Sequence, residues 1–217
     1  MGKVEKMIHR DQLLQIIEEI TTVITTNKQF LTDLDQAIGD GDHGINLDRG
    51  FRAIQDKVAA VQDKDCGTIL KTVAMGLIST VGGASGPLYG TIFMKAAQVV
   101  GTKMEISKED AVKAFDEAIQ GVMARGKANQ GDKTMLDVLI PAYEAFKTAV
   151  EQGESFAAAA SQAVAAAEKG VEYTKTIAAK KGRANYLGER SIGHQDPGAT
   201  SSYLMLKAIS DVLEREA

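Results

Sequence analysis

The sequence is short of several residue types, and each shortage excludes a class of protein. Cys66 is the only cysteine among the 217 residues, which excludes an internal disulfide and a zinc site built from several thiolates. No apolar run approaches the ~18 residues that a membrane-spanning helix needs, and the first residues lack the apolar segment of a signal peptide. Tryptophan is absent and proline occurs three times, which suits a helical protein. We therefore expect a protein of the reducing cytoplasm with no membrane partner.

Positive charge is also scarce. The 25 lysines and arginines are outnumbered by 29 aspartates and glutamates, the net charge is −4, and the sequence contains no basic tract. This pattern gives no support for nucleic-acid binding. Since 44% of the residues are hydrophobic, a chain of this length can enclose a substantial core. We expect one domain over residues 1–217 and no nucleic-acid partner.

What the sequence does have is an acidic segment at residues 34–46. It contains Asp35, Asp40, Asp42 and His43 together with three glycines. Carboxylates that are held close together repel one another and raise one another's pKa. A bound hard cation removes this repulsion, and Mg²⁺ commonly bridges one or two carboxylates and the phosphates of a substrate. The segment therefore predicts a metal site that holds a phosphate compound. The alternative is a polar loop in which Asp40 caps a helix.

Two other motifs overlap with this acidic segment. Residues 39–44 match the pattern G-x-G-x-x-G, but no strand pattern precedes them and two acids would face the pyrophosphate of a dinucleotide. The same stretch begins like a calcium loop, yet Ile45 and Phe51 stand where an EF-hand needs glycine and glutamate. We therefore reject both a dinucleotide fold and an EF-hand.

Apolar residues recur with the period of an α-helix along most of the chain, so the sequence predicts an all-α protein. We count eight helices and find no convincing strand and no internal repeat. Asp35 lies near the end of the first helix, where the helix dipole disfavours a carboxylate, and a bound cation would remove this conflict. The first helix could be interrupted near Asn27. The expected helices cover residues 11–38, 45–61, 67–81, 87–100, 107–125, 135–152, 156–179 and 197–214.

A glycine-rich loop is the second candidate part of a site. Residues 79–90 place three glycines and Ser85 before Pro87, and the exposed N–H groups of such a loop form a concave anion site. The alternative is a simple connection between two helices. Residues 121–128 come close to a Walker A motif, but they end in Ala128 where a metal-binding serine or threonine is required. We reject a P-loop.

The third candidate is a long polar loop at residues 180–200, which contains Arg183 and Arg190. Loops of this length in a compact domain are usually functional or disordered, and a guanidinium group binds phosphate through two hydrogen bonds. Asp196 precedes the last helix and is expected to cap it, whether or not it also lines a site. Residues 126–134 form another polar connector, which the sequence alone describes only as a solvated loop.

The segments with unusual composition are residues 38–44, 82–87, 125–127, 131–135, 182–184 and 193–200. In this order they resemble the motifs of one known family, the nucleotide-binding L subunit of dihydroxyacetone kinase. The resemblance covers nearly the whole chain. It implies a barrel-like bundle of eight antiparallel helices, with the nucleotide held by the loops at one end.

The resemblance also implies the site residues. Asp35, Asp40 and Asp42 match three aspartates that hold two Mg²⁺ ions against the phosphates of ADP or ATP. Arg183 matches a nucleotide contact, and we hypothesise that it stabilises the phosphoryl group during transfer. The residues expected to line the nucleotide are His43, Gly44, Ile45, Asn46, Ala84, Ser85, Gly126, Met135, Arg183, Asp196, Pro197 and Gly198.

The partners follow from the same resemblance. The acceptor, dihydroxyacetone, is held on a separate K subunit by a covalent bond to a histidine of that subunit, which fits the absence of an evident nucleophile–base pair in this sequence. In the multi-subunit type, bound ADP is rephosphorylated in place by a phosphohistidine-bearing M subunit of the phosphotransferase system. We expect this type, because the chain contains only the L part, and we expect a homodimer. The alternatives are an L subunit that uses free ATP, a non-catalytic nucleotide-binding module and an unrelated helical bundle.

Overall fold

The computed structural model describes residues 7–215, and it confirms the all-α prediction. Within this range nine α-helices and one 3₁₀ helix account for most of the chain. They are α1 (Arg10–Thr26), α2 (Lys28–Ile38), α3 (His43–Ala59), α4 (Cys66–Thr80), α5 (Ser85–Val100), α6 (Lys108–Gly126), α7 (Leu136–Glu151), α8 (Phe156–Thr174), the 3₁₀ helix η1 (Arg183–Ser191) and α9 (Pro197–Arg215).

The helix count differs from the expected eight because the first predicted helix is two helices and the long polar loop contains η1. The break falls at Asn27, whose backbone leaves the helical region at φ −95° and ψ 10°. The side-chain amide of Asn27 donates a hydrogen bond to the carbonyl oxygen of Val23 at 2.9 Å, so it competes with the backbone for a helical acceptor. The break near Asn27 is the one that the sequence suggested.

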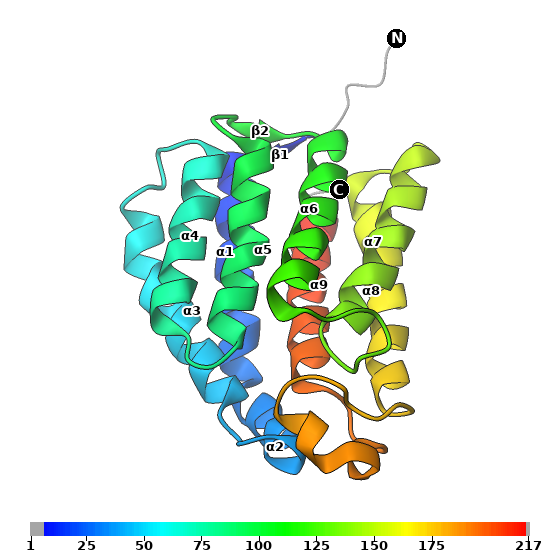
Figure 1. The fold of residues 1–217 in the computed structure, drawn as a ribbon. Helices are drawn as coiled ribbons and strands as arrows, with labels where there is room; N and C mark the ends of the chain where they lie inside the picture. Colours follow the sequence, from blue (N-terminus) through cyan, green and yellow to red (C-terminus); the bar gives the residue numbers. More distant parts are fainter. Residues whose placement is uncertain (1–6, 216–217) are drawn as a thin grey trace.

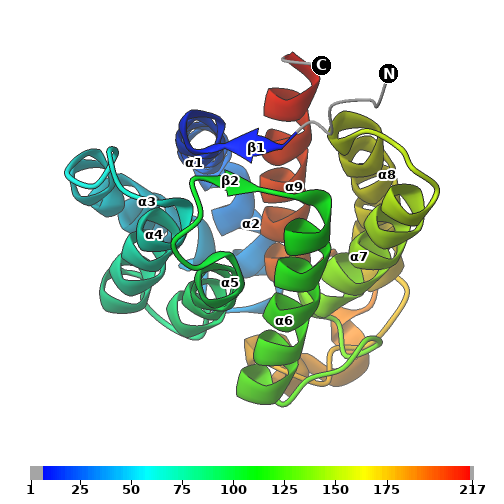
Figure 2. The ribbon, with the colours of Figure 1, turned by 90° about the horizontal axis from the view of Figure 1, so that it is seen from above.

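The helices pack in chain order. Each helix from α3 to α8 packs on the next one along the chain, and α9 packs back on α1. Figure 2 shows this arrangement along the helix axes, with α1 and α9 between the two ends of the row. In Figure 1, α2 and the orange 3₁₀ helix lie together at one end of the bundle. The connections α2–α3, α4–α5 and α8–α9 lie at this same end, and they carry the motifs that the sequence singled out.

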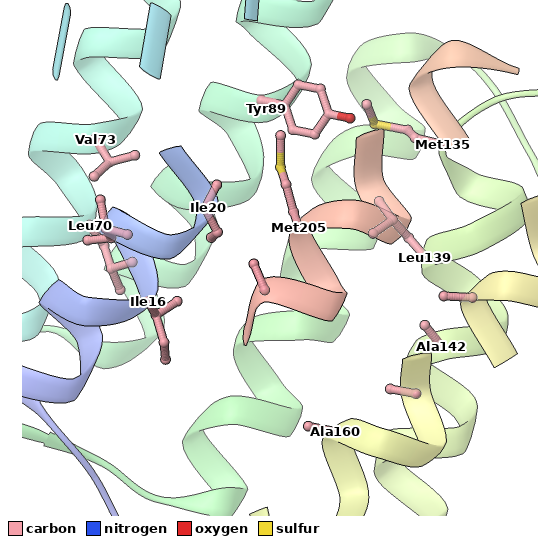
Figure 3. Packing of buried hydrophobic residues seen from close by; sticks show 14 of the residues in the cluster. Ile16, Ile20, Leu70, Val73, Tyr89, Met135, Leu139, Ala142, Ala160 and Met205 are labelled. Atoms are coloured by element: carbon pink, nitrogen blue, oxygen red, sulfur yellow. The ribbon is translucent and has the colours of Figure 1, made fainter. Parts of the chain in front are cut away.

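Apolar side chains from several helices fill the interior and fix the positions of these connections. Burial of such side chains stabilises the fold by about 25 cal/mol per Å² of apolar surface removed from water. The alanines of α8 that are buried, such as Ala159, Ala163 and Ala167, let this helix approach α7 closely. Figure 3 shows part of the interior cluster, formed by Ile16, Ile20, Leu70, Val73, Tyr89, Met135, Leu139, Ala142, Ala160 and Met205.

Some local expectations were wrong. No convincing strand was expected, yet β1 (Ile8–His9) and β2 (Glu105–Ile106) form an antiparallel pair in which Ile8 lies opposite Ile106. Two residues are too few to produce a period-2 pattern. Helix α8 ends at Thr174 and not near residue 179, and α5 begins at Ser85, two residues before Pro87. Within residues 7–215, no helix is long and apolar enough to cross a membrane.

Candidate functional site

The three aspartates of the acidic segment converge in space. Asp35 lies on α2, Asp40 lies in the short connection, and Asp42 is the residue before α3. One carboxylate oxygen from each of them can be chosen so that all three lie within 4.8 Å of one another. Three carboxylates at this spacing form an oxygen donor set of the kind that Mg²⁺ prefers. The residues present therefore fit a magnesium site.

Asp35 is the buried and fixed member of the cluster. Its Oδ2 accepts hydrogen bonds from the backbone N–H groups of Asp42 (2.9 Å) and His43 (3.1 Å). These groups lie at the start of α3, where the helix dipole favours a negative charge. The dipole conflict expected at the end of α2 is thus offset by the start of α3. A Cβ atom at Gly39 would collide with Asp35 Oδ1, so glycine leaves room for this carboxylate.

The other two aspartates are more exposed and less engaged. Arg183 Nη2 lies 2.9 Å from Asp40 Oδ2, and this is an ion pair between two exposed side chains. Asp42 occupies the N-cap position of α3, yet its side chain accepts no capping hydrogen bond within the described chain. The alternative that Asp40 merely caps a helix is therefore wrong. Asp42 retains its carboxylate oxygens for a ligand.

A cavity of about 700 Å³ lies beside the three aspartates. Four connections contribute to it: α2–α3, α4–α5, α6–α7 and α8–α9. A cavity of this size matches the pockets that hold a nucleotide-sized ligand. The predicted site residues that line it are Asp35, Asp40, Asp42, His43, Ala84, Ser85, Gly126, Met135, Arg183, Asp196, Pro197 and Gly198.

Three predicted contacts do not line this cavity. Gly44 lies where a Cβ atom would collide with the carbonyl oxygen of Lys28, so it allows α3 to pack closely on α2. Ile45 is 46% exposed. Asn46 is buried, and its Oδ1 accepts a hydrogen bond from Arg49 Nη2 at 2.7 Å. Gly44 therefore supports the packing of α3 on α2, and Asn46 lies beside Gly82 of the α4–α5 connection.

The α4–α5 connection presents the start of a helix to the cavity. Gly83 has φ +65°, a conformation that glycine adopts without strain. The N-cap residue of α5 is Ala84, which has no side chain able to cap the helix. The N–H groups of the first turn are consequently available to an anion. Ser85 adds a hydroxyl group at the same position.

His43 is held by hydroxyl groups from two other helices. Its Nδ1 lies 3.1 Å from Ser85 Oγ and its Nε2 lies 2.8 Å from Ser201 Oγ. The Tyr89 hydroxyl lies 2.6 Å from Ser201 Oγ and 3.0 Å from Ser202 Oγ. Burial lowers the pKa of His43 to about 4, although the Asp35 charge opposes this shift. His43 is therefore neutral near pH 7, and it connects α3 to α5 and α9.

The rest of the cavity wall is mainly apolar. Flat aromatic rings such as nucleobases bind well between apolar side chains. Most of these side chains come from the start of α5, the end of α6, the start of α7 and the α6–α7 connection, whereas the aspartates and Arg183 lie on or next to the α2–α3 and α8–α9 connections. The apolar side chains belong to Ile38, Leu88, Val122, Ala128, Met135 and Leu136.

Asp196 has two roles in the structure. Its Oδ2 accepts a hydrogen bond from the N–H group of Ala199 at 2.7 Å, so it caps α9 as expected, and it also lines the cavity. Burial raises the pKa of Asp196 to about 7, and the charges of Asp137 and Asp35 act in the same direction while the Ala199 hydrogen bond and Lys133 oppose it.

Sequence reasoning missed several residues that support the site. Tyr89, Ser201 and Ser202 form the hydroxyl network around His43, but each stands in an ordinary helical pattern. Lys133 was part of a connector described as solvated, yet it is only 1% exposed. Burial lowers the pKa of the Lys133 ammonium group. No sequence signal distinguishes such a buried lysine from a solvated one.

The comparisons with known proteins point to one family. The DAK2 domain family matches residues 37–211. The chain is 45% identical over 203 residues to the PEP-dependent dihydroxyacetone kinase, ADP-binding subunit DhaL, of Escherichia coli (strain K12), which covers 94% of this chain and 97% of that protein. It is 36% identical over 207 residues to the PTS-dependent dihydroxyacetone kinase, ADP-binding subunit DhaL, of Lactococcus lactis subsp. lactis (strain IL1403), with coverage of 95% and 100%.

A solved structure shares the fold. The native form of the dihydroxyacetone kinase of C. freundii matches with a TM-score of 0.69 and 26% identity over 92% of this chain. The present chain spans only 34% of the length of that kinase. The fold, the order of the motifs and the relatives agree: the chain belongs to the DAK2 domain family, alongside the DhaL subunits of dihydroxyacetone kinases.

Proposed function

We propose that this chain is the nucleotide-binding subunit of a dihydroxyacetone kinase. It would carry ADP or ATP with Mg²⁺ and pass a phosphoryl group to dihydroxyacetone held on a separate K subunit. The observation that carries the proposal is the convergence of Asp35, Asp40 and Asp42 within 4.8 Å beside a cavity of about 700 Å³. The relatives named as ADP-binding subunits support it.

Asp35, Asp40 and Asp42 would hold two Mg²⁺ ions. Bound Mg²⁺ neutralises a polyphosphate and stabilises the charge that develops as the γ-phosphoryl group moves. Asp35 is positioned for this task because its Oδ2 is engaged by two backbone N–H groups, which leaves Oδ1 for a cation. Without a cation, three negative charges at this spacing repel one another.

The chain's own groups would bind the rest of the nucleotide. The N–H groups at the start of α5 and the Ser85 hydroxyl would receive phosphate oxygens, as helix N-termini commonly do. The apolar part of the wall, including Leu88 and Met135, would hold the base. Neutral His43, fixed by Ser85 and Ser201, would keep the Ser85 hydroxyl in place.

Arg183 is the residue we assign to the transferring phosphoryl group. Its guanidinium carries a permanent charge and binds two phosphate oxygens at once. In this structure it is paired with Asp40, and a surface pair of this kind contributes at most about 1 kcal/mol. A nucleotide with its cations could therefore separate the two side chains at little cost, giving the phosphate to Arg183 and a cation to Asp40.

A second function deserves consideration because Ser85 and His43 form a nucleophile–base geometry that the sequence did not reveal. In a hydrolase with a serine–histidine–aspartate triad, the histidine nitrogen that does not face the serine nucleophile is hydrogen-bonded to a carboxylate. Here it faces the Ser201 hydroxyl. A histidine with a pKa of about 4 is also a weak base near pH 7. The geometry favours nucleotide binding over hydrolysis.

The partner subunits complete the proposal. Because the DhaL relatives are named as PEP-dependent or PTS-dependent, we propose that bound ADP is rephosphorylated in place by a phosphohistidine-bearing M subunit. We also propose a homodimer that docks on the K subunit. The competing arrangements are an L subunit that exchanges free ATP and a nucleotide-binding module that transfers no phosphate.

The test begins with the chain purified without added nucleotide and then denatured. Release of near-stoichiometric ADP with magnesium supports the captive cofactor, whereas an empty protein that binds ATP reversibly supports direct ATP use. Mixing the protein with the K subunit, dihydroxyacetone and the nucleotide then measures phosphoryl transfer. Nucleotide binding with no transfer would indicate the regulatory module, and no binding at all would contradict the proposal.

A further inference from the structure

Lys133 is the least expected charged group of the structure. It lies in the α6–α7 connection, it is 1% exposed, and its backbone has φ +61°. A lysine is almost never fully buried unless its charge is compensated. The composition of the α6–α7 connection predicts only a solvated loop and no role in a site.

Four backbone carbonyl oxygens surround the Lys133 ammonium group. Its Nζ donates to Thr174 O (2.6 Å), Ser191 O (2.7 Å), Ile177 O (3.2 Å) and His194 O (2.5 Å). An ammonium group has three protons, so the number of acceptors exceeds the number of donors. The arrangement is a cage of carbonyl dipoles around one charge, comparable with the carbonyl oxygens that replace the hydration shell of a cation.

These four carbonyl groups belong to the two ends of one segment. Thr174 and Ile177 lie at and just beyond the end of α8, whereas Ser191 and His194 lie at and just beyond the end of η1. The segment between them, residues 178–190, carries Arg183. Lys133 therefore closes the base of the loop that presents Arg183 to the cavity.

The position of Lys133 is itself fixed from the other side. The buried carboxylate of Asp137 accepts hydrogen bonds from the N–H groups of Gly131 (2.5 Å) and Thr134 (2.8 Å). These two residues flank the lysine closely in the sequence, and Asp137 belongs to the first turn of α7. Lys133 therefore connects the first turn of α7 to residues 174–194, the loop that carries Arg183.

We propose that Lys133 is a positioning residue, a tethered cation whose carbonyl cage holds residues 174–194 so that Arg183 meets the phosphates of the nucleotide. This inference rests on the proposed function of the cavity as a nucleotide site. Lys133 acts through the loop and does not itself touch the phosphates.

The first test compares Lys133→Met, which keeps the unbranched apolar part of the side chain and removes the ammonium group, with Lys175→Met as a matched control. Lys175 lies in the same segment, but its side chain is partly exposed and its ammonium group pairs with Glu172. Hydrogen exchange of the chain without nucleotide is expected to be at least tenfold faster in residues 175–194 of Lys133→Met and unchanged in the control. Equal protection in both variants would overturn the proposal. This readout needs no nucleotide, so it is separate from a failure of the proposed function.

The second test asks whether the lysine acts through Arg183. We expect Lys133→Met to weaken the binding of ADP with Mg²⁺ at least tenfold, and the double variant with Arg183→Ala to bind no more weakly than Lys133→Met alone. If Lys133→Met only made the fold less stable, adding Arg183→Ala would still weaken ADP binding further. Independent, multiplicative effects of the two substitutions would overturn the positioning role.

A third variant covers the case in which Lys133→Met does not fold. Lys133→Ala lacks the propylammonium part of the side chain, and the lysine lines the cavity, through which a small amine can enter. Added propylammonium is expected to raise the melting temperature of Lys133→Ala and to restore protection of residues 175–194, whereas propanol does neither. Equal effects of the two additives, or no effect of either, would overturn the proposal.

Discussion

Arg183 and Asp40 are ion-pair partners from two connections far apart in the sequence, with Nη2 and Oδ2 separated by 2.9 Å. Both side chains are exposed, so the pair adds little to stability. The ion pair instead keeps the Arg183 and Asp40 side chains next to each other. The pair lies at the edge of the cavity, where we propose that Arg183 binds phosphate and Asp40 binds a cation.

The first prediction concerns the metal site. Asp40→Asn removes one of the three carboxylates, and we expect it to abolish phosphoryl transfer while the far-ultraviolet circular dichroism of the helical fold stays unchanged. The measurement is turnover with the K subunit and dihydroxyacetone in the presence of Mg²⁺. Asp63→Asn, at an exposed aspartate on the α3–α4 connection, serves as the control. Unchanged turnover of Asp40→Asn would refute the metal assignment.

A second prediction separates the role of Arg183 in transfer from any role in stability. Arg183→Gln is expected to lower the rate of transfer by ~10³-fold, the range found for arginines that stabilise a phosphoryl group. The free energy of unfolding should change by less than about 1 kcal/mol, because only a surface ion pair is lost. Single-turnover kinetics and urea denaturation measure the two quantities. A rate equal to that of the original chain would exclude Arg183 from the transfer step.

The third prediction concerns the space that Gly39 leaves for Asp35. In Gly39→Ala the new Cβ would collide with Asp35 Oδ1, so the carboxylate must rotate and its hydrogen bonds to the start of α3 weaken. We expect ADP to bind at least tenfold more weakly in the presence of Mg²⁺, with destabilisation of ~1 to 3 kcal/mol from overpacking. Gln36→Ala, on the same helix and exposed, is the control. Equal ADP affinity in both variants would contradict the role of Gly39.

The fourth prediction uses the raised pKa of Asp196. Because the folded state holds the proton up to about pH 7 while the unfolded chain loses it near pH 4, the group makes the fold less stable as the pH rises through this window. Asn caps a helix as well as Asp, so Asp196→Asn keeps the α9 cap without the charge. The stability of the variant relative to the original chain should rise between pH 5 and pH 8 by about 3 kcal/mol, because two pKa units of about 1.4 kcal/mol each lie in this window.

Urea denaturation at both pH values, without nucleotide or metal, measures this difference. A stability difference that does not change with pH would show that Asp196 titrates near its ordinary pKa. A gain at pH 5 that disappears at pH 8 would reverse the predicted sign.

A fifth prediction addresses the hydroxyl network. Tyr89→Phe removes the hydroxyl that meets Ser201, Ser202 and the carbonyl oxygen of Gly198. Loss of these buried hydrogen bonds should lower the free energy of unfolding by ~1 to 3 kcal/mol. Thermal denaturation checks this, with Tyr203→Phe on α9 as the control. Equal stability of the two variants would show that the hydrogen bonds of the Tyr89 hydroxyl do not stabilise the fold.

The helices and the acidic segment could be predicted from sequence because both are local. Helical periodicity reports the buried face of each helix, and three aspartates within eight residues need no long-range contact to be recognised. The sequence allowed a break near Asn27, and the structure has one at this residue. Predicted boundaries were wrong where tertiary contacts decide them, as at Thr174, whose hydroxyl accepts a hydrogen bond from the N–H group of Asp196.

The supporting residues of the site could not be predicted, because each depends on contacts between distant segments. His43 meets Ser201 across 158 residues, and Lys133 meets His194 O across 61. A serine in a helix and a lysine in a polar loop look ordinary until the fold brings them to their partners. The resemblance to the family named the expected nucleotide contacts, most of which line the cavity, but it gave no reason for the buried lysine.

Metal-dependent nucleotide binding is tested by a calorimetric titration of the nucleotide-free chain with ADP, in Mg²⁺ and in EDTA, alongside Asp40→Asn. We expect one ADP per chain, with affinity that falls at least tenfold in EDTA and equally in the variant. At ADP ~100 times above the dissociation constant, this binding should stabilise the fold by about 2.7 kcal/mol. No binding in either buffer, or equal affinity with and without Mg²⁺, would contradict the account.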